Sequence, residues 1–121
     1  MVLVTVNQAK RLIYYAYIGE VKHEEMKRAR EETAELLKHL PAGIRVLGDL
    51  ERLESMDAAS STEIGAMMDM LDCKGIEVSV RVIPDPSKDI GLSILSTFHY
   101  RKKVRIITCA SMLEAAKELG L

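Results

Sequence analysis

Residues 44–83 read IRVLGDLERLESMDAASSTEIGAMMDMLDCKGIEVSVRVI, and this stretch decides the class of fold. The apolar positions of its first seven residues are nearly continuous, which is typical of a strand that is covered on both faces. Residues 76–83 alternate in polarity, as a strand does. Between the two strands the chain predicts a helix that starts at Asp57 or Ser60 and ends at Lys74. A helix between two strands indicates a crossover that places those strands parallel in one sheet. The expected buried stripe of this helix is Ile64, Met67, Met68 and Leu71.

The flanking sequence continues the alternation of strands and helices. Two extended runs come first, joined by a short turn, and a long amphipathic helix follows them. After residue 83 the pattern predicts a third helix, a short strand and a last helix that Ser111 caps. The third helix has Ile90, Ile94, Leu95 and Phe98 at helical spacing. The other expected strands are residues 2–7, 11–18 and 104–107. The other expected helices are residues 22–40, a helix that begins after Ser87, and a helix that ends at Gly120.

The order ββαβαβαβα predicts an α/β sandwich with a mixed, mainly parallel five-stranded sheet and about four helices. A length of 121 residues fits a single domain over residues 1–121. The chain has 48% hydrophobic and 29% charged residues, a composition typical of a globular protein.

Charge and cysteine content narrow the classes of function. Seventeen Lys and Arg residues against 18 Asp and Glu residues give a net charge of −1, so no overall field attracts nucleic acid or an acidic membrane, and we expect no nucleic-acid partner. The first apolar run lacks a basic segment and stops at Asn7, so it predicts neither a signal peptide nor an integral membrane segment. Cys73 and Cys109 follow no metal or redox spacing and are expected to be small buried fillers. A cytoplasmic protein is the resulting expectation.

Residues 49–57, Asp-Leu-Glu-Arg-Leu-Glu-Ser-Met-Asp, carry a family resemblance. The chain resembles the STAS domain family, in its SpoIIAA-like branch, which includes bacterial anti-sigma-factor antagonists. That family has a strand that ends in Asp-Leu, a turn, and Asp-Ser-Ser-Gly at the start of a helix, with the same spacing between the two aspartates. Residues 18–21 and 112–119 also resemble the family's first turn and closing helix. The resemblance implies a domain that binds a protein partner, such as a regulatory kinase or an anti-sigma-like protein, or a second copy of itself as a homodimer.

The chain departs from the family at the residue that the antagonists phosphorylate. Ala58 stands there, and alanine has no hydroxyl to accept a phosphoryl group. The serine switch is therefore either absent, which we favour, or moved to Ser60 or Ser61. A simpler role for Ser60 is to cap the helix in a capping box with Glu63.

The resemblance makes the helix after Asp57 the element that contacts the partner. The expected partner-binding residues are Asp57, Ser60, Ser61 and Met70. Met70 lies roughly 200–300° around the helix from the buried stripe, so it is expected to point outward. We thus predict a non-catalytic regulatory or interaction domain with no catalytic residue, no cofactor and no metal site.

Two alternatives remain open. A small-ligand or lipid-binding module would use an apolar pocket at the strand ends, whereas a flat exposed helix would favour a protein partner. An enzyme acting on a phosphorylated substrate would use acidic residues near the carboxyl ends of strands, although turn and cap roles are the favoured explanation for them. These acidic residues are Asp49, Asp57, Asp85 and Asp89. The histidines His23, His39 and His99 lack ligand spacing and are expected at surfaces or helix ends.

Two further groups of residues have open roles. The basic run 99–105 either contacts a phosphate, a lipid headgroup or an acidic partner, or is a solvated junction. Tyr15 and Tyr17 share one face of the second strand and Tyr14 takes the other. These tyrosines either pack in the core or, if the strand lies at a sheet edge, join a dimer interface.

Overall fold

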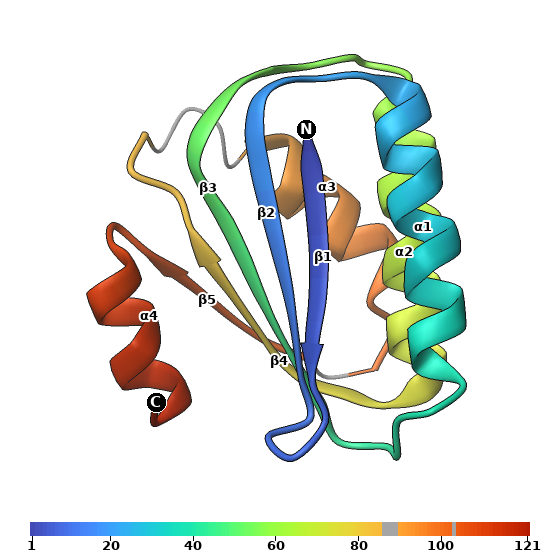
Figure 1. The fold of residues 1–121 in the computed structure, drawn as a ribbon, viewed down its shortest axis with the longest axis vertical. Helices are drawn as coiled ribbons and strands as arrows, with labels where there is room; N and C mark the ends of the chain where they lie inside the picture. Colours follow the sequence, from blue (N-terminus) through green and yellow to red (C-terminus); the bar gives the residue numbers. More distant parts are fainter. Residues whose placement is uncertain (86–89, 103) are drawn as a thin grey trace.

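A computed structural model describes residues 1–85, 90–102 and 104–121. Within these residues a five-stranded sheet runs in the order β1-β2-β3-β4-β5, and four helices pack against it (Figure 1). The strands are β1 (Val2–Asn7), β2 (Leu12–Val21), β3 (Ile44–Met56), β4 (Ile76–Val82) and β5 (Arg105–Cys109). The helices are α1 (His23–Leu37), α2 (Ser60–Lys74), α3 (Ile90–His99) and α4 (Met112–Leu119).

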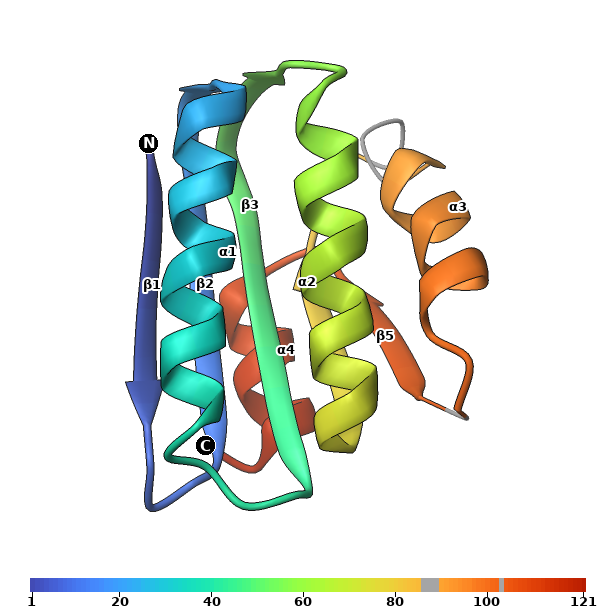
Figure 2. The same ribbon diagram turned by 90° about the vertical axis from the view of Figure 1, so that its right-hand side faces the viewer.

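The sheet is mixed and mainly parallel, which confirms the predicted architecture. β1 pairs antiparallel with β2 through the expected short turn, and each later strand pairs in parallel with the one before it. The helices α1, α2 and α3 cover one face of the sheet, and α4 covers the other (Figures 1 and 2). None of the helices in the described part of the chain is long and apolar enough to cross a bilayer.

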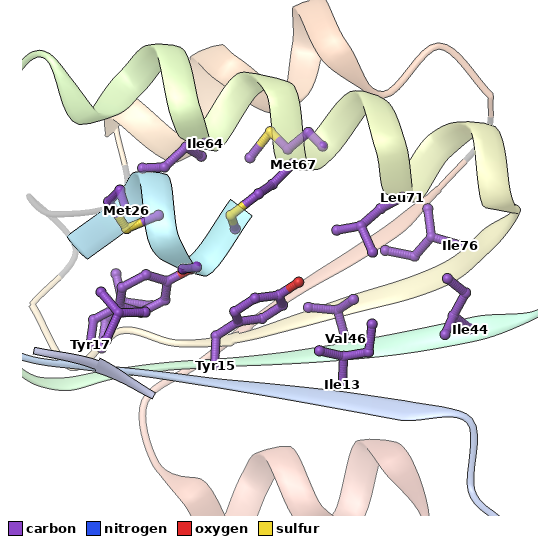
Figure 3. Close-up of a cluster of buried hydrophobic side chains, with 14 of the residues drawn as sticks. Ile13, Tyr15, Tyr17, Met26, Ile44, Val46, Ile64, Met67, Leu71 and Ile76 are labelled. Atoms are coloured by element: carbon purple, nitrogen blue, oxygen red, sulfur yellow. The ribbon is translucent and has the colours of Figure 1, made fainter. Parts of the chain in front are cut away.

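The main core lies between the sheet and the pair α1 and α2. Figure 3 shows Tyr15 and Tyr17 of β2 directed toward Met67 of α2, beside Met26 of α1. The rings of Tyr15 and Tyr17 stack with their centroids 6.4 Å apart. The hydroxyl of Tyr15 forms a buried 2.8 Å hydrogen bond with Thr33, a bond worth about 1 kcal/mol. Core packing of these tyrosines is thus confirmed, and β2 is not an edge strand, because β1 covers its outer side.

A smaller core lies under α4. It contains Leu47 of β3, Val80 of β4, and Ala115 and Leu119 of α4. Cys109 is buried here, as predicted, whereas Cys73 is exposed on α2, so the prediction of a buried filler was wrong for Cys73.

The parallel pair β2 and β3 is longer than the sequence suggested. β2 continues past Gly19 to Val21, and β3 continues past Leu50 to Met56. The register shifts between Ala16 and Ile18 and again after Gly19, whose φ of +67° is easy only for glycine. Both strands are therefore irregular where they extend beyond β4. The sequence did not predict this extension, because it contains many polar residues.

The extension changes the position of Asp49. This residue was expected at the end of a strand, but it lies inside β3, where it pairs with Val82, the last residue of β4. The connection from β3 to α2 is consequently only residues 57–59.

The third helix buries a different face from the one its spacing suggested. Ile94 and Phe98 are 55% and 70% exposed, whereas Ser96 is buried. The side that faces the core carries Leu92 and Leu95 together with Ser96, whose hydroxyl accepts a hydrogen bond from the guanidinium of Arg81 on β4. Leu95 of the predicted stripe therefore does pack inward, whereas Ile94 and Phe98 face solvent. The helix α1 likewise ends at Leu37, three residues before its predicted end.

Substitution of Gly65 tests the packing of α3 on α2. A Cβ atom at Gly65 would lie 2.6 Å from Nε2 of His99, so Gly65→Ala must displace the imidazole. We expect the free energy of unfolding, measured in urea, to fall by about 1–2 kcal/mol. The matched control is Gly91→Ala, because a Cβ there meets nothing within 4 Å, and its stability should not fall. In a His99→Ala background the cost of Gly65→Ala should vanish; an unchanged cost would contradict this packing.

Candidate functional site

The connection between β3 and α2 is an exposed part of the region that carries the family resemblance. Asp57, Ala58 and Ala59 are all exposed, and so are Ser61 and Thr62 in the first turn of α2. The amide of Ser60 donates to the carbonyl of Asp57 at 2.9 Å, and a 3.2 Å bond joins Ser61 to Ala58 in the same way. These tight bonds hold the connection in one shape. It is a short, ordered surface at the start of the helix.

Asp57 links three elements. Its amide donates to the carbonyl of Val21 at the end of β2, at 3.0 Å. Its carboxylate accepts a 3.1 Å hydrogen bond from the amide of His23, the first residue of α1. A carboxylate at this point satisfies a free helix donor and complements the positive end of the helix dipole. Asp57 therefore positions α1 as well as the connection to α2.

Ser60 does not form the predicted capping box. The N-cap position of α2 is Ala59, whose backbone is helical, with φ −62° and ψ −21°, and no side chain caps the helix. The turn at residues 57–59 already runs into the helix, so no extended residue precedes it to act as a side-chain cap. Ser60 is 0% exposed, and its hydroxyl has no hydrogen-bond partner among the residues that the structure describes. In this conformation a kinase or a partner protein has no access to that hydroxyl.

Ser61 is the more accessible of the two serines. Its side chain is exposed, and its hydroxyl donates a 2.8 Å hydrogen bond to the carbonyl of Ala58. Ser61 and Asp57 therefore flank the same exposed connection.

Glu63 forms a polar link between α1 and α2 that the sequence analysis missed. Its carboxylate accepts a hydrogen bond from Nε of Arg30, and its other oxygen lies 3.2 Å from Nε2 of His23. The bond from Arg30 is the main cause that holds the pKa of Glu63 below its ordinary value, and His23 adds to it. These partners are 33 and 40 residues away in the chain, so no local spacing could reveal them.

An apolar groove lies beside the exposed connection. It has a volume of about 260 Å³ and runs between the end of β3, the start of α2 and the start of α3. Its apolar lining includes Leu53, Met56, Ile64, Leu92 and Leu95, and Ser61 also borders it.

Met70 lies at the other end of α2. It is ten residues beyond Ser60, about 15 Å along the helix axis. It is half-buried and packs against the main core, in a furrow that it shares with Leu37, Lys38 and Cys73. Met70 thus points only partly outward, and the structure does not bring it to the connection at Asp57.

The described aspartates of the enzyme alternative, Asp49, Asp57 and Asp85, do not form one metal-binding group. Asp49 is buried and accepts a 3.0 Å bond from the hydroxyl of Tyr14 and another from the amide of Glu51. Burial and the Asp49 carboxylate raise the pKa of Tyr14. Asp85 is exposed, and Asp89 falls outside the described residues. Among the residues that the structure describes, no three His, Cys, Asp or Glu side chains come together as metal ligands.

Comparison with solved structures identifies the fold. The anti-sigma factor antagonist SpoIIAA in its unphosphorylated form superposes with a TM-score of 0.69 at 14% identity, covering 99% of this chain and 98% of that one. An uncharacterized DUF3478-family protein with a SpoIIAA-like fold, from Shewanella loihica, gives 0.72 at 10% identity over 98% and 92% of the two chains. Phosphorylated SpoIIAA, a cell fate determinant of Bacillus, gives 0.67 at 16% identity over 98% and 99%.

The chain thus has the SpoIIAA-like fold of STAS domains, as the resemblance predicted. No protein-family model and no curated protein sequence matches it.

The link from Glu63 to Arg30 and His23 is tested by measuring the stability of the protein as a function of pH. Because its folded pKa lies below the ordinary value of 4.5, its bonds stabilise the fold above that value, and the stabilisation is lost as the pH falls through the folded pKa. Glu63→Gln should therefore be less stable than the parent protein at pH 7, and the difference should shrink as the pH falls through the folded pKa. Glu35 is the control, since it pairs with exposed Lys38, and Glu35→Gln should change the urea midpoint far less. A difference that stays constant as the pH is lowered from 7 into the acid range would refute the link.

Proposed function

We propose that this chain is a non-catalytic regulatory domain that binds a protein partner, or a second copy of itself, in the cytoplasm. The contact surface is the exposed connection from Asp57 to Ala59 together with the start of α2. The observation that carries the proposal is the exposure of this ordered connection, directly beside the apolar groove. An exposed polar rim next to an apolar hollow is the usual anatomy of a specific protein interface.

The partner class follows from the fold relatives. The comparison proteins include an anti-sigma factor antagonist that exists in unphosphorylated and phosphorylated forms. We infer that the partner of this chain is of the same kind, a regulatory kinase or an anti-sigma-like protein. A contact of roughly 800 Å² per side would suffice for specific binding.

The chemistry of the connection favours binding that phosphorylation does not switch. Ala58 has no hydroxyl, and the hydroxyl of Ser60 is enclosed. Ser61 has the exposed hydroxyl, and it is engaged with the carbonyl of Ala58.

A small-ligand or lipid-binding module is the second candidate. It rests on the same apolar groove, whose volume of about 260 Å³ is near the lower end of the range for small-molecule sites. The two candidates differ in which residues matter, since a small ligand would need the interior of the groove and a protein partner would need its rim.

The absence of the serine switch leads to one prediction. Protein purified from its native cell should carry no phosphate on residues 57–62 when its peptides are analysed by mass spectrometry. The same result is expected after incubation with serine kinases, and an Ala58→Ser variant is the control that offers such a kinase an exposed hydroxyl. Phosphate on Ser60 or Ser61 of the parent protein would show that the switch has moved instead.

The proposed contact surface is tested by two substitutions at the ends of α2. Ser61→Arg places a bulky cation on the exposed rim, and we expect partner or self association to weaken by about tenfold or more. Met70→Lys should weaken association only if the contact extends along the whole helix, and its half-buried position adds a loss of stability. Association is measured by light scattering for self-assembly and by titration calorimetry with an isolated partner.

The control is Lys117→Glu on α4, on the opposite face of the sheet, which should leave association unchanged. If Ser61→Arg leaves both kinds of association intact, the surface is not the interface. If it instead abolishes only the binding of a small apolar ligand, the second candidate is correct.

A further inference from the structure

The segment from Ile90 to Cys109 is basic and contains no acidic residue. It carries four of the 17 Lys and Arg residues of the chain and none of the 18 Asp and Glu residues. The charges are therefore unevenly distributed along the chain, although the net charge is only −1: this segment is positive and the rest of the chain is acidic. This segment forms α3, the following connection and the edge strand β5.

The same segment exposes large apolar side chains. Phe98 is 70% exposed and Ile94 is 55% exposed, and they lie four residues apart on the outer side of α3. Ile106 of β5 is 41% exposed at the adjoining edge of the sheet. Single exposed apolar residues are ordinary, but here they are grouped on one helix face beside cations.

Two cations lie beside this apolar face. Arg101 and Lys102 are exposed just after the end of α3. Arg105 of β5 belongs to the opposite face of the sheet, because its guanidinium lies 3.6 Å from Glu118 of α4 and side chains alternate along a strand. A hollow of about 230 Å³ lies between α3 and β5, and Lys102, Ser93 and Ile106 are among its lining residues. Figure 2 shows α3 and β5 at the side of the molecule opposite to β1.

We propose that this basic apolar face, formed by Ile94, Phe98, Arg101, Lys102 and Ile106, docks the protein on an anionic lipid bilayer. Apolar side chains that stand out from a helix insert at the boundary between headgroups and acyl chains, while adjacent lysines and arginines are attracted to anionic headgroups. The hydroxyl and ammonium groups at the hollow match the chemistry of a lipid phosphate. The outward side of α3 exposes Ile94 and Phe98, and a bilayer is a partner that can bury them without a complementary protein shape.

Charge and residue type favour a bilayer over a nucleic acid. Nucleic-acid surfaces are read by several hydrogen-bonding or stacking side chains, whereas the centre of this face is one aliphatic and one aromatic side chain. The proposal is independent of the partner surface at Asp57, since α3 presents its outer side away from α2.

Binding is measured by sedimentation with vesicles. The probes are vesicles of phosphatidylcholine alone and vesicles in which about one third of the lipid is anionic phosphatidylglycerol. The parent protein should bind the anionic vesicles at low salt, bind neutral vesicles far less, and be released at high salt. Phe98→Ser should weaken binding by about tenfold, and the pair Arg101→Glu with Lys102→Glu should abolish it. Leu113→Ser on α4, where Leu113 is 67% exposed, and Lys27→Glu on α1 are the matched controls and should bind normally.

A fluorescent reporter tests the orientation independently. The chain contains no tryptophan, so Phe98→Trp introduces a single probe at the proposed contact. Its emission should shift to the blue with anionic vesicles, whereas Leu113→Trp should not shift. Absence of binding to anionic vesicles, equal binding to neutral vesicles, or equal losses in the control variants would overturn the proposal. The proposal would also be overturned if the protein bound a DNA duplex or an acidic protein in a salt-sensitive way, and if the same substitutions abolished that binding but left vesicle binding intact.

Discussion

The parallel pairing of β2 with β3 is the constraint on which the rest of the structure depends. These two strands run together beyond β4, as far as Val21 and Met56. At that end the amide of Asp57 donates a hydrogen bond to the carbonyl of Val21, and the carboxylate of Asp57 accepts one from the first amide of α1. The helix α1 follows β2 closely, and only residues 57–59 separate β3 from α2. Both helices therefore start at the same end of the sheet. The exposed connection before α2 is therefore held by the longest strand pair in the described sheet.

Much of the fold was predictable from local patterns, because alternating and helical periodicities occupy separate stretches of the chain. The strand extension from Glu51 to Met56 was not predictable, since these residues are mostly polar and are recruited by pairing with β2. The side of α3 was predicted wrongly because hydrophobicity alone favours burial of Ile94 and Phe98. The helix instead turns Leu92 and Leu95 to the core, together with the Ser96 hydroxyl beside Arg81. Such contacts depend on residues far apart in sequence.

The candidate site was likewise predictable from the sequence only in part. The exposed connection at Asp57 and the stripe of α2 follow from spacing, and the structure contains both. The role of Ser60 failed because the residues before it already turn as a helix, so the serine became an enclosed first residue instead of a cap. The link from Glu63 to Arg30 and His23 had no sequence signal at all. Its partners lie on α1, and only tertiary packing selects them.

Total charge is a poor guide to the partners of a small domain when the charges are segregated. A net charge of −1 suggests indifference to anionic surfaces, and that expectation treats the chain as a uniform sphere. Electrostatic attraction in salt acts over a Debye length of about 8 Å, which is smaller than the domain. A surface that approaches α3 and β5 therefore experiences the cations of that face, while the acidic residues of α1 lie on the far side of α2. The domain can thus present one face to an anionic surface and leave the start of α2 free for a protein.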